Sequence, residues 1–264
     1  MTEPFAIRKP KSDDPQSSSG NEKVIEFIHV RKSFGNKQVL TDINFELHKQ
    51  QNAVVLGKSG TGKSVFIQCI VGLAYPDAGV LKVFGTDILD GVEDEEDLIK
   101  IRRKVGFLFQ GGALYDSMTV KENLEFPLKR QLKVPSRGEI KDLVLEALES
   151  VGLVEARNKM PAELSGGMKK RIALARTLIL KPEIMLYDEP TTGLDPVTSR
   201  EISELILEMQ EKYHISSIII THDISCAKIT ANRIYLLKDG VFYAEGAFDE
   251  LEHSDDPWIR AFFE

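Results

Sequence analysis

The segment Gly57–Ser64 constrains the fold of this chain more than any other part of the sequence. It has the order GKSGTGKS, it follows the apolar run 52–56, and it precedes a stretch whose apolar residues recur at helical spacing. Glycines let the backbone curl so that its N–H groups point inward, and the start of the following helix adds positive potential at the same place. The pattern therefore predicts a phosphate-binding loop between a strand and a helix of an α/β fold.

Two side chains of this loop have predicted roles on a nucleoside triphosphate. Lys63 supplies positive charge to the β- and γ-phosphates, and the hydroxyl group of Ser64 is a ligand for Mg²⁺. The alternative is a glycine-rich turn that binds nothing, but every position of the loop and both flanking segments match the phosphate-loop pattern. The predicted nucleotide-binding residues are Gly57, Lys58, Ser59, Gly60, Thr61, Gly62, Lys63 and Ser64.

Two other predicted strands end in side chains that suit the same chemistry. The apolar run Ile184–Tyr187 leads into Asp188 and Glu189, and the run Ser217–Ile220 is followed by His222. Because α/β sites form at the carboxyl ends of parallel strands, we expect Asp188 to hold Mg²⁺ and Glu189 to orient or deprotonate a water molecule. His222 is expected to contact the γ-phosphate. Solvated acids and a structural histidine are the alternatives.

Phe34 precedes the phosphate loop in a section rich in strand-forming residues. An aromatic ring at this place is suited to stacking on the base of a nucleotide, a contact that tolerates any base. Packing of the ring in the hydrophobic core is an equally good interpretation of the sequence alone.

The strand pattern as a whole predicts an α/β fold, a P-loop NTPase core with a mainly parallel sheet. In front of it, Val24–Val30 and Gln38–Leu47 alternate apolar and polar residues around a Gly35-Asn36 turn, which predicts an antiparallel β section. The predicted core strands are Ala53–Leu56, Val105–Phe109, Ile184–Tyr187, Ser217–Ile220 and Ile234–Leu237.

Helical signals are concentrated in the middle of the chain. Ser136 and Glu139 form a capping box before a helical apolar pattern, and a second helix is predicted to begin near Gly166. We therefore expect a helical subdomain at about 111–165, inserted in an ATPase domain at 23–247. Residues 1–22 are polar and aperiodic and are expected to be disordered, and 248–264 is expected to be a short C-terminal tail.

Composition limits the partners of the chain. Its 264 residues carry 34 Lys and Arg against 41 Asp and Glu, for a net charge of −7, which disfavours a broad electrostatic hold on nucleic acid. Cys69 and Cys226 lie outside any metal-binding or disulfide pattern and are expected to be small buried residues. The sequence has neither a signal segment nor an apolar run long enough to span a bilayer, so we expect it to stay in the cytosol.

The ordered set of motifs resembles the ATPase subunits of ABC transporters over nearly the whole chain. In that family an aromatic residue, a phosphate loop, a glutamine, an LSGGQ signature, an Asp-Glu pair, a D-loop and a histidine follow one another. The matching positions are Phe34, Gly57–Ser64, Gln110, Leu164–Met168, Asp188-Glu189, Gly193–Asp195 and His222. This chain departs from the pattern in having Met168 for the usual glutamine and Gly193 for a common alanine.

The resemblance implies that two copies of the chain close around two molecules of ATP and hydrolyse them with Mg²⁺. It implies catalytic roles for Lys63, Gln110 and His222, with Glu189 as the base. The metal residues are then Ser64, Gln110 and Asp188. Contacts from one copy to the nucleotide of the other are implied for Ser165, Gly166, Gly167 and Asp195.

A narrower resemblance, to the ATPases of MCE-type lipid transporters (the Mla and Mkl group), rests on the segment 107–120, the Met168 signature and Ser254–Arg260. It implies an integral-membrane permease partner, an MCE lipid-binding subunit, phospholipid or a related lipid as cargo, and a place at the cytoplasmic face of the inner membrane. Ala113–Tyr115 is the expected permease contact. The alternative is that Leu114 and Tyr115 pack within the helical subdomain.

Overall fold

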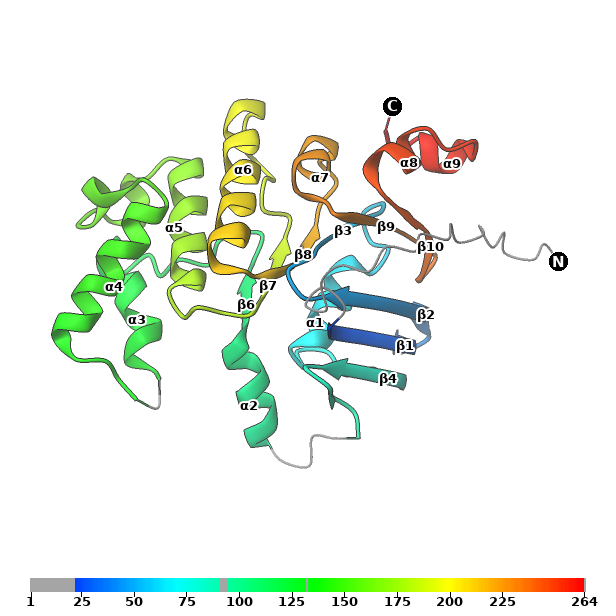
Figure 1. Ribbon diagram of the computed structural model, residues 1–264, viewed down its shortest axis with the longest axis horizontal. Helices are drawn as coiled ribbons and strands as arrows, with labels where there is room; N and C mark the ends of the chain where they lie inside the picture. The colour runs from blue at the N-terminus through cyan, green and yellow to red at the C-terminus, as the bar shows by residue number, and fades with distance from the viewer. Residues whose placement is uncertain (1–21, 91–94, 132, 264) are drawn as a thin grey trace, which may run out of the picture.

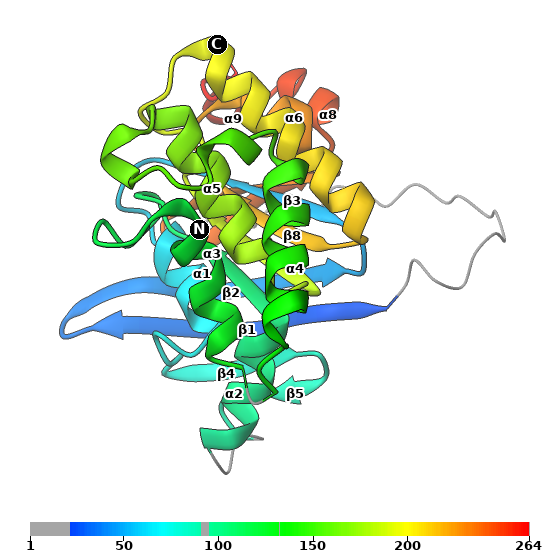
Figure 2. The same cartoon turned by 90° about the vertical axis from the view of Figure 1, so that its left-hand side faces the viewer.

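The computed structural model describes residues 22–90, 95–131 and 133–263, so the predicted tail lies almost wholly outside the described residues. These residues form two β-sheets with helices between them and on one side (Figures 1 and 2). The predicted α/β fold is confirmed. No helix within the described ranges is both long and apolar enough to cross a membrane.

The larger sheet has six strands in the order β10-β9-β3-β8-β7-β6. Its neighbours pair in parallel except for β10, which pairs antiparallel with β9. The strands are β3 (Asn52–Leu56), β6 (Val105–Leu108), β7 (Ile184–Asp188), β8 (Ser216–Ile220), β9 (Arg233–Lys238) and β10 (Val241–Gly246). The strand predicted to reach Phe109 ends one residue earlier, and the Phe109 ring stacks on Phe107 with ring centroids 4.2 Å apart.

The smaller sheet has the order β2-β1-β4-β5 and pairs antiparallel throughout. Its strands are β1 (Lys23–Phe34), β2 (Lys37–His48), β4 (Ala78–Val83) and β5 (Thr86–Asp87). The strands β1 and β2 are longer than predicted because irregularities in register interrupt the alternation without ending the pairing. At one of them Gly79 has φ +97, and a Cβ atom on it would lie 2.5 Å from the carbonyl oxygen of His29.

The helices cover the sheets unequally. They are α1 (Lys63–Ile70), α2 (Glu95–Lys104), α3 (Val120–Lys129), α4 (Arg137–Ser150), α5 (Gly166–Leu178), α6 (Pro196–Tyr213), α7 (Ile224–Thr230), α8 (Phe248–Glu252) and α9 (Pro257–Arg260). Short 3₁₀ turns at Val154–Ala156 and Pro161–Glu163 lie between α4 and α5. The predicted capping box of α4 is confirmed, since Ser136 and Glu139 each accept a hydrogen bond from the other's backbone N–H.

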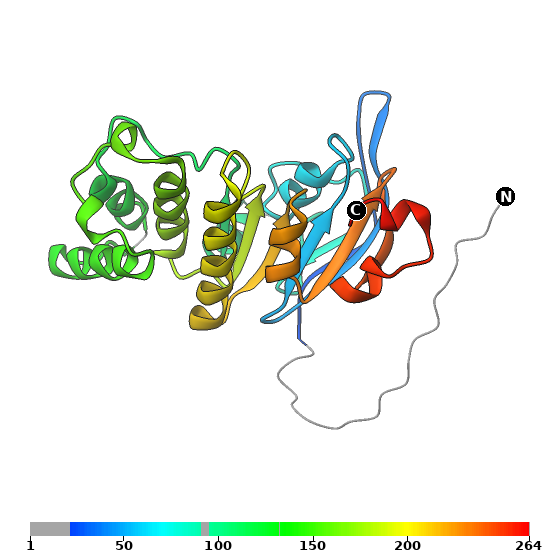
Figure 3. The same ribbon diagram turned by 90° about the horizontal axis from the view of Figure 1, so that it is seen from above.

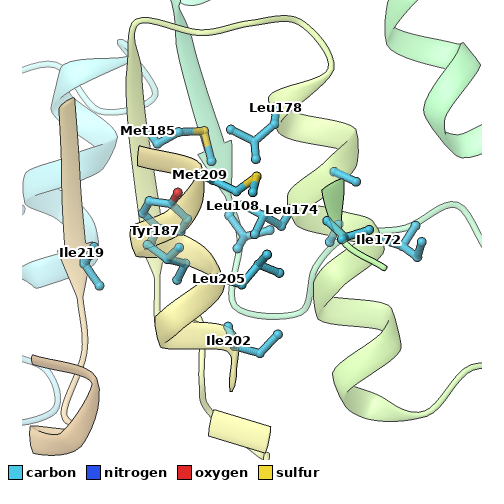
Figure 4. Packing of buried hydrophobic residues seen from close by; sticks show 14 of the residues in the cluster. Leu108, Ile172, Leu174, Leu178, Met185, Tyr187, Ile202, Leu205, Met209 and Ile219 are labelled. Atoms are coloured by element: carbon cyan, nitrogen blue, oxygen red, sulfur yellow. The ribbon is translucent and has the colours of Figure 1, made fainter. Parts of the chain in front are cut away.

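The two faces of the larger sheet belong to different hydrophobic clusters. On β3, Ala53 and Val55 pack with α1 and the smaller sheet, whereas Val54 and Leu56 pack with α5, α6 and α7, as the two-residue period of a strand requires. Figure 4 shows the second cluster, in which Tyr187 and Ile219 of the sheet meet Leu174 of α5 and Leu205 of α6. Helix α1, which follows the phosphate loop, is therefore held between the two sheets.

The segment between β6 and β7 contains α3, α4, both 3₁₀ turns and α5, which lie together at one end of the molecule (Figures 1 and 3). At the other end, α8 and α9 lie beside β10 and bury Leu251 and Ile259. Cys69 and Cys226 are buried free thiols, as predicted.

Candidate nucleotide site

The phosphate loop joins β3 to α1 and encloses the ammonium group of Lys63. That group donates hydrogen bonds to the carbonyl oxygens of Gly57, at 2.7 Å, and Lys58, at 3.1 Å. Burial lowers the pKa of Lys63, while the carboxylates of Glu189 and Asp188 oppose that shift. The site thus holds a buried positive charge at the start of a helix, which is the arrangement that binds phosphate groups.

The loop is braced from behind by the smaller sheet. Gly62, the residue before α1, has φ +104, and a Cβ atom there would lie 2.9 Å from Cγ1 of Val39 on β2. Only glycine satisfies both the backbone conformation and the contact. The predicted loop residues Lys58, Ser59 and Gly60 are exposed, so their backbone is open to a ligand.

Ser64 and Asp188 form a pair of oxygen ligands at the sheet edge. The hydroxyl group of Ser64 donates to Oδ1 of Asp188 over 3.3 Å. Burial is the main cause that raises the pKa of Asp188. One carboxylate and one hydroxyl group beside a phosphate site fit Mg²⁺, which keeps several waters and takes its other ligands from substrate phosphates.

Glu189 follows β7 in an uncommon backbone conformation, with φ +53. Its N–H group donates to the carbonyl oxygen of Ile220, and its carboxylate accepts a 3.2 Å hydrogen bond from Thr192. The same carboxylate lies next to the imidazole ring of His222, which follows β8. The two predicted catalytic side chains therefore meet at the carboxyl ends of neighbouring strands.

Two cations of α5 that the sequence did not single out contact this region. Lys170 donates to the carbonyl oxygens of Gln110 and Glu189. Arg176 donates to the carbonyl oxygens of Ala113, at 2.7 Å, and Gly112, at 3.2 Å. The only sequence signal was a run of basic residues at the start of this helix.

The predicted signature residues lie apart from the phosphate loop of their own chain. Ser165 caps α5, where its hydroxyl group accepts a 3.3 Å hydrogen bond from the N–H of Met168. A Cβ atom on Gly167 would lie 2.6 Å from Cγ2 of Thr198, and Asp195 caps α6 through the N–H groups of Val197 and Thr198. Figures 1 and 3 place α5 on the far side of β6 and β7 from α1.

Two aromatic residues with predicted contacts are at the surface. Phe34 is 52% exposed at the end of β1, which excludes the alternative of core packing. Tyr115 is also exposed, with Arg176 over its ring and Phe126 beside it, whereas Leu114 packs against the larger hydrophobic cluster. The packing alternative for the segment Ala113–Tyr115 thus holds for Leu114.

A phosphate loop with a buried lysine, a Ser-Asp pair and a Glu-His pair on a parallel sheet define an ATP-binding P-loop ATPase. The family model described as ABC transporter matches residues 40–192. The chain belongs to the ABC transporter family and is an ATP-hydrolysing cassette of it.

Individual relatives agree with this assignment. The chain is 39% identical over 238 residues to a probable ribonucleotide transport ATP-binding protein, mkl, of Mycobacterium leprae, with 90% of this chain and 68% of the relative covered. It is 34% identical to the intermembrane phospholipid transport system ATP-binding protein MlaF of Haemophilus influenzae, with 89% and 88% covered. The dimeric post-hydrolysis structure of the cassette MJ0796, bound to ADP and Pi, has a TM-score of 0.76 and 32% identity, covering 85% of this chain and 98% of that one.

Proposed function

We propose that two copies of this chain close around two molecules of ATP and that closure drives a separate membrane permease. The observation that carries this proposal is the exposed start of α5, where Ser165 and Gly166 face away from their own phosphate loop. A helix start is suited to an anion, and a second copy brings one. The dimeric relative bound to ADP and Pi supports the same arrangement.

Within one copy, the nucleotide is held by the phosphate loop and by residues at the strand ends. Lys63 neutralises the β- and γ-phosphates, and Phe34 stacks on the base. Ser64 and Asp188 hold Mg²⁺, and Gln110, at the exit of β6, reaches the same metal. When bound, Mg²⁺ supplies charge neutralisation at the β- and γ-phosphate oxygens.

Hydrolysis is assigned to the Glu189–His222 pair. The Glu189 carboxylate accepts a proton from water as the water oxygen forms its bond to the γ-phosphorus, and the bond from that phosphorus to the ADP oxygen breaks. His222 holds the carboxylate through their hydrogen bond and lies where it also reaches the γ-phosphate. From the partner copy, Ser165, Gly166, Gly167 and Asp195 complete the site and exclude water.

The proposed cargo is a phospholipid or a related lipid, moved between membranes with an MCE lipid-binding subunit. Its support is the similarity to a relative named for intermembrane phospholipid transport, which extends over 88% of that protein. The permease would contact the exposed ring of Tyr115 and the neighbouring Ala113. The chain would then lie at the cytoplasmic face of the membrane through its permease.

Purification of the native complex from membranes, followed by mass spectrometry of its subunits and bound small molecules, tests this proposal. A polytopic permease, an MCE subunit and bound phospholipid are expected. Another permease with a bound nucleotide, as the name of the mycobacterial relative implies for that protein, would overturn the lipid cargo and leave the transporter role. Recovery without any membrane subunit would overturn the transporter role.

A further inference from the structure

The ammonium group of Lys170 joins three segments that are far apart in the sequence. The residue lies in the first turns of α5, directly after the signature, and its side chain is 8% exposed. Its Nζ atom donates to the carbonyl oxygen of Gln110, at the exit of β6, and over 3.3 Å to the carbonyl oxygen of Glu189, at the exit of β7. One charge thus connects the signature helix with the backbone of two residues of the hydrolytic site.

A buried ammonium group carries a cost that an apolar side chain at this place avoids. Burial lowers the pKa of Lys170, and the nearby carboxylates of Glu189 and Asp188 act in the opposite direction. Removing a charge from water costs several kcal/mol unless hydrogen bonds and opposite charges compensate. The two carbonyl contacts and the carboxylates are that compensation, so the charge is specific to this junction.

The contact with Glu189 acts on the one residue of the site whose backbone is left-handed. A non-glycine residue at φ +53 persists where its surroundings fix it. The N–H of Glu189 is held by Ile220 and its carbonyl oxygen by Lys170, so both peptide groups that set the direction of its side chain are restrained. Loss of the Lys170 contact frees the second of these peptides.

The contact with Gln110 is one of several that fasten the following loop to α5. Arg176, farther along the same face, holds the carbonyl oxygens of Gly112 and Ala113. The loop that leaves β6 is therefore fixed to α5 at both of its ends. Displacement of α5 moves this loop with it, and Lys170 passes the displacement on to Glu189.

We propose that Lys170 is a positioning residue that aligns the Glu189 carboxylate according to the position of α5. This inference rests on the proposed closure of two copies, since α5 then begins at the nucleotide held by the partner. A copy that closes on its partner's ATP sets the carboxylate that acts on its own ATP. The two sites of the dimer are linked through one ammonium group in each copy.

The test compares the full-length chain with its Lys170→Met, Lys170→Arg and Lys169→Met variants. Lys169 is the matched control because it is the exposed neighbour in the same turn. Lys170→Met is expected to lower kcat about 10- to 100-fold, the effect of a misplaced catalytic group, with the KM for ATP and the affinity for a fluorescent ATP analogue within about twofold of the parent. Lys170→Arg restores most of kcat, and Lys169→Met changes neither constant.

Parental kcat in a folded Lys170→Met variant overturns the inference, and so does a loss of ATP affinity as large as the loss of kcat. If Lys170→Met does not fold, Lys170→Gln keeps a donor without the charge, and the same two readouts decide. Introducing Lys170→Met into a Glu189→Gln chain separates this inference from the proposed dimer. Failure of Glu189→Gln itself to dimerise with ATP contradicts closure, whereas dimers of both chains together with parental kcat for Lys170→Met contradict only the role of Lys170.

Discussion

The Nδ1 atom of His222 lies 2.7 Å from Oε2 of Glu189, and the two side chains have opposite environments. His222 is 67% exposed, whereas the carboxylate side chain it contacts is 14% exposed. An accessible imidazole ring therefore holds a sheltered carboxylate at the edge of the sheet. A group that displaces or joins His222 changes the environment of the proposed base directly.

Replacement of Glu189 by glutamine keeps the size and the hydrogen bonds of the side chain but removes its ability to accept a proton. We expect Glu189→Gln to bind ATP normally and to lose roughly 100-fold or more of kcat. Steady-state phosphate release and binding of a fluorescent ATP analogue measure the two effects. Turnover equal to that of the parent, measured with the permease present, would show that another group is the base.

Lys63→Ala removes the buried charge of the phosphate loop and the two hydrogen bonds to its carbonyl oxygens. ATP affinity is expected to fall roughly 10- to 100-fold, since hydrogen bonds to charged groups contribute about 1.5–3 kcal/mol. Isothermal titration calorimetry with ATP measures the loss. Lys58→Ala, at an exposed position of the same loop, is the control and should bind much more tightly than Lys63→Ala.

Ser165→Arg places a large cation at the start of α5. Hydrolysis should be abolished while ATP binding stays nearly intact, because the proposed contact is with the nucleotide of the partner copy. Loss of the helix cap costs about 1 kcal/mol, which a thermal melt can detect separately. If the variant folds but no longer binds ATP, Ser165 serves the nucleotide of its own chain.

Gly79→Ala tests the packing of the smaller sheet, away from the site. The new Cβ atom would lie 2.5 Å from a backbone oxygen, and φ +97 is unfavourable for alanine, so we expect a loss of about 2 kcal/mol or more in the free energy of unfolding. Gly138→Ala, in the first turn of α4 with only Ser136 Oγ near its new atom, is the control and should be neutral or slightly stabilising. Urea denaturation followed by circular dichroism measures both.

Signals that are local in the sequence predicted the elements that position the site. An apolar run that ends in acidic residues predicted β7 and its polar end, and a capping box predicted where α4 begins. Each depends on residues within a few positions of one another, so a single chain reveals them. The strand lengths of the smaller sheet were wrong because His29, with φ +50, and its neighbours disturb the alternation while pairing continues.

The role of Lys170 was not predictable in the same way. Its partners Gln110 and Glu189 are brought to it by the packing of α5 against the sheet, and both offer backbone oxygens, which leave no trace in residue type. The sequence showed only a basic residue near a helix start. Surface exposure likewise decided between stacking and core packing for Phe34, because an aromatic residue at a strand end suits both.

The strand β2 touches both ends of the nucleotide site. It pairs with β1 next to Phe34, and its Val39 side chain packs against Gly62 of the phosphate loop. The distance between the proposed base-stacking ring and the phosphate loop is therefore set by a single hairpin. A substitution that shifts this hairpin changes the fit of the base and of the triphosphate together, so neither end can adapt to a different nucleotide independently of the other.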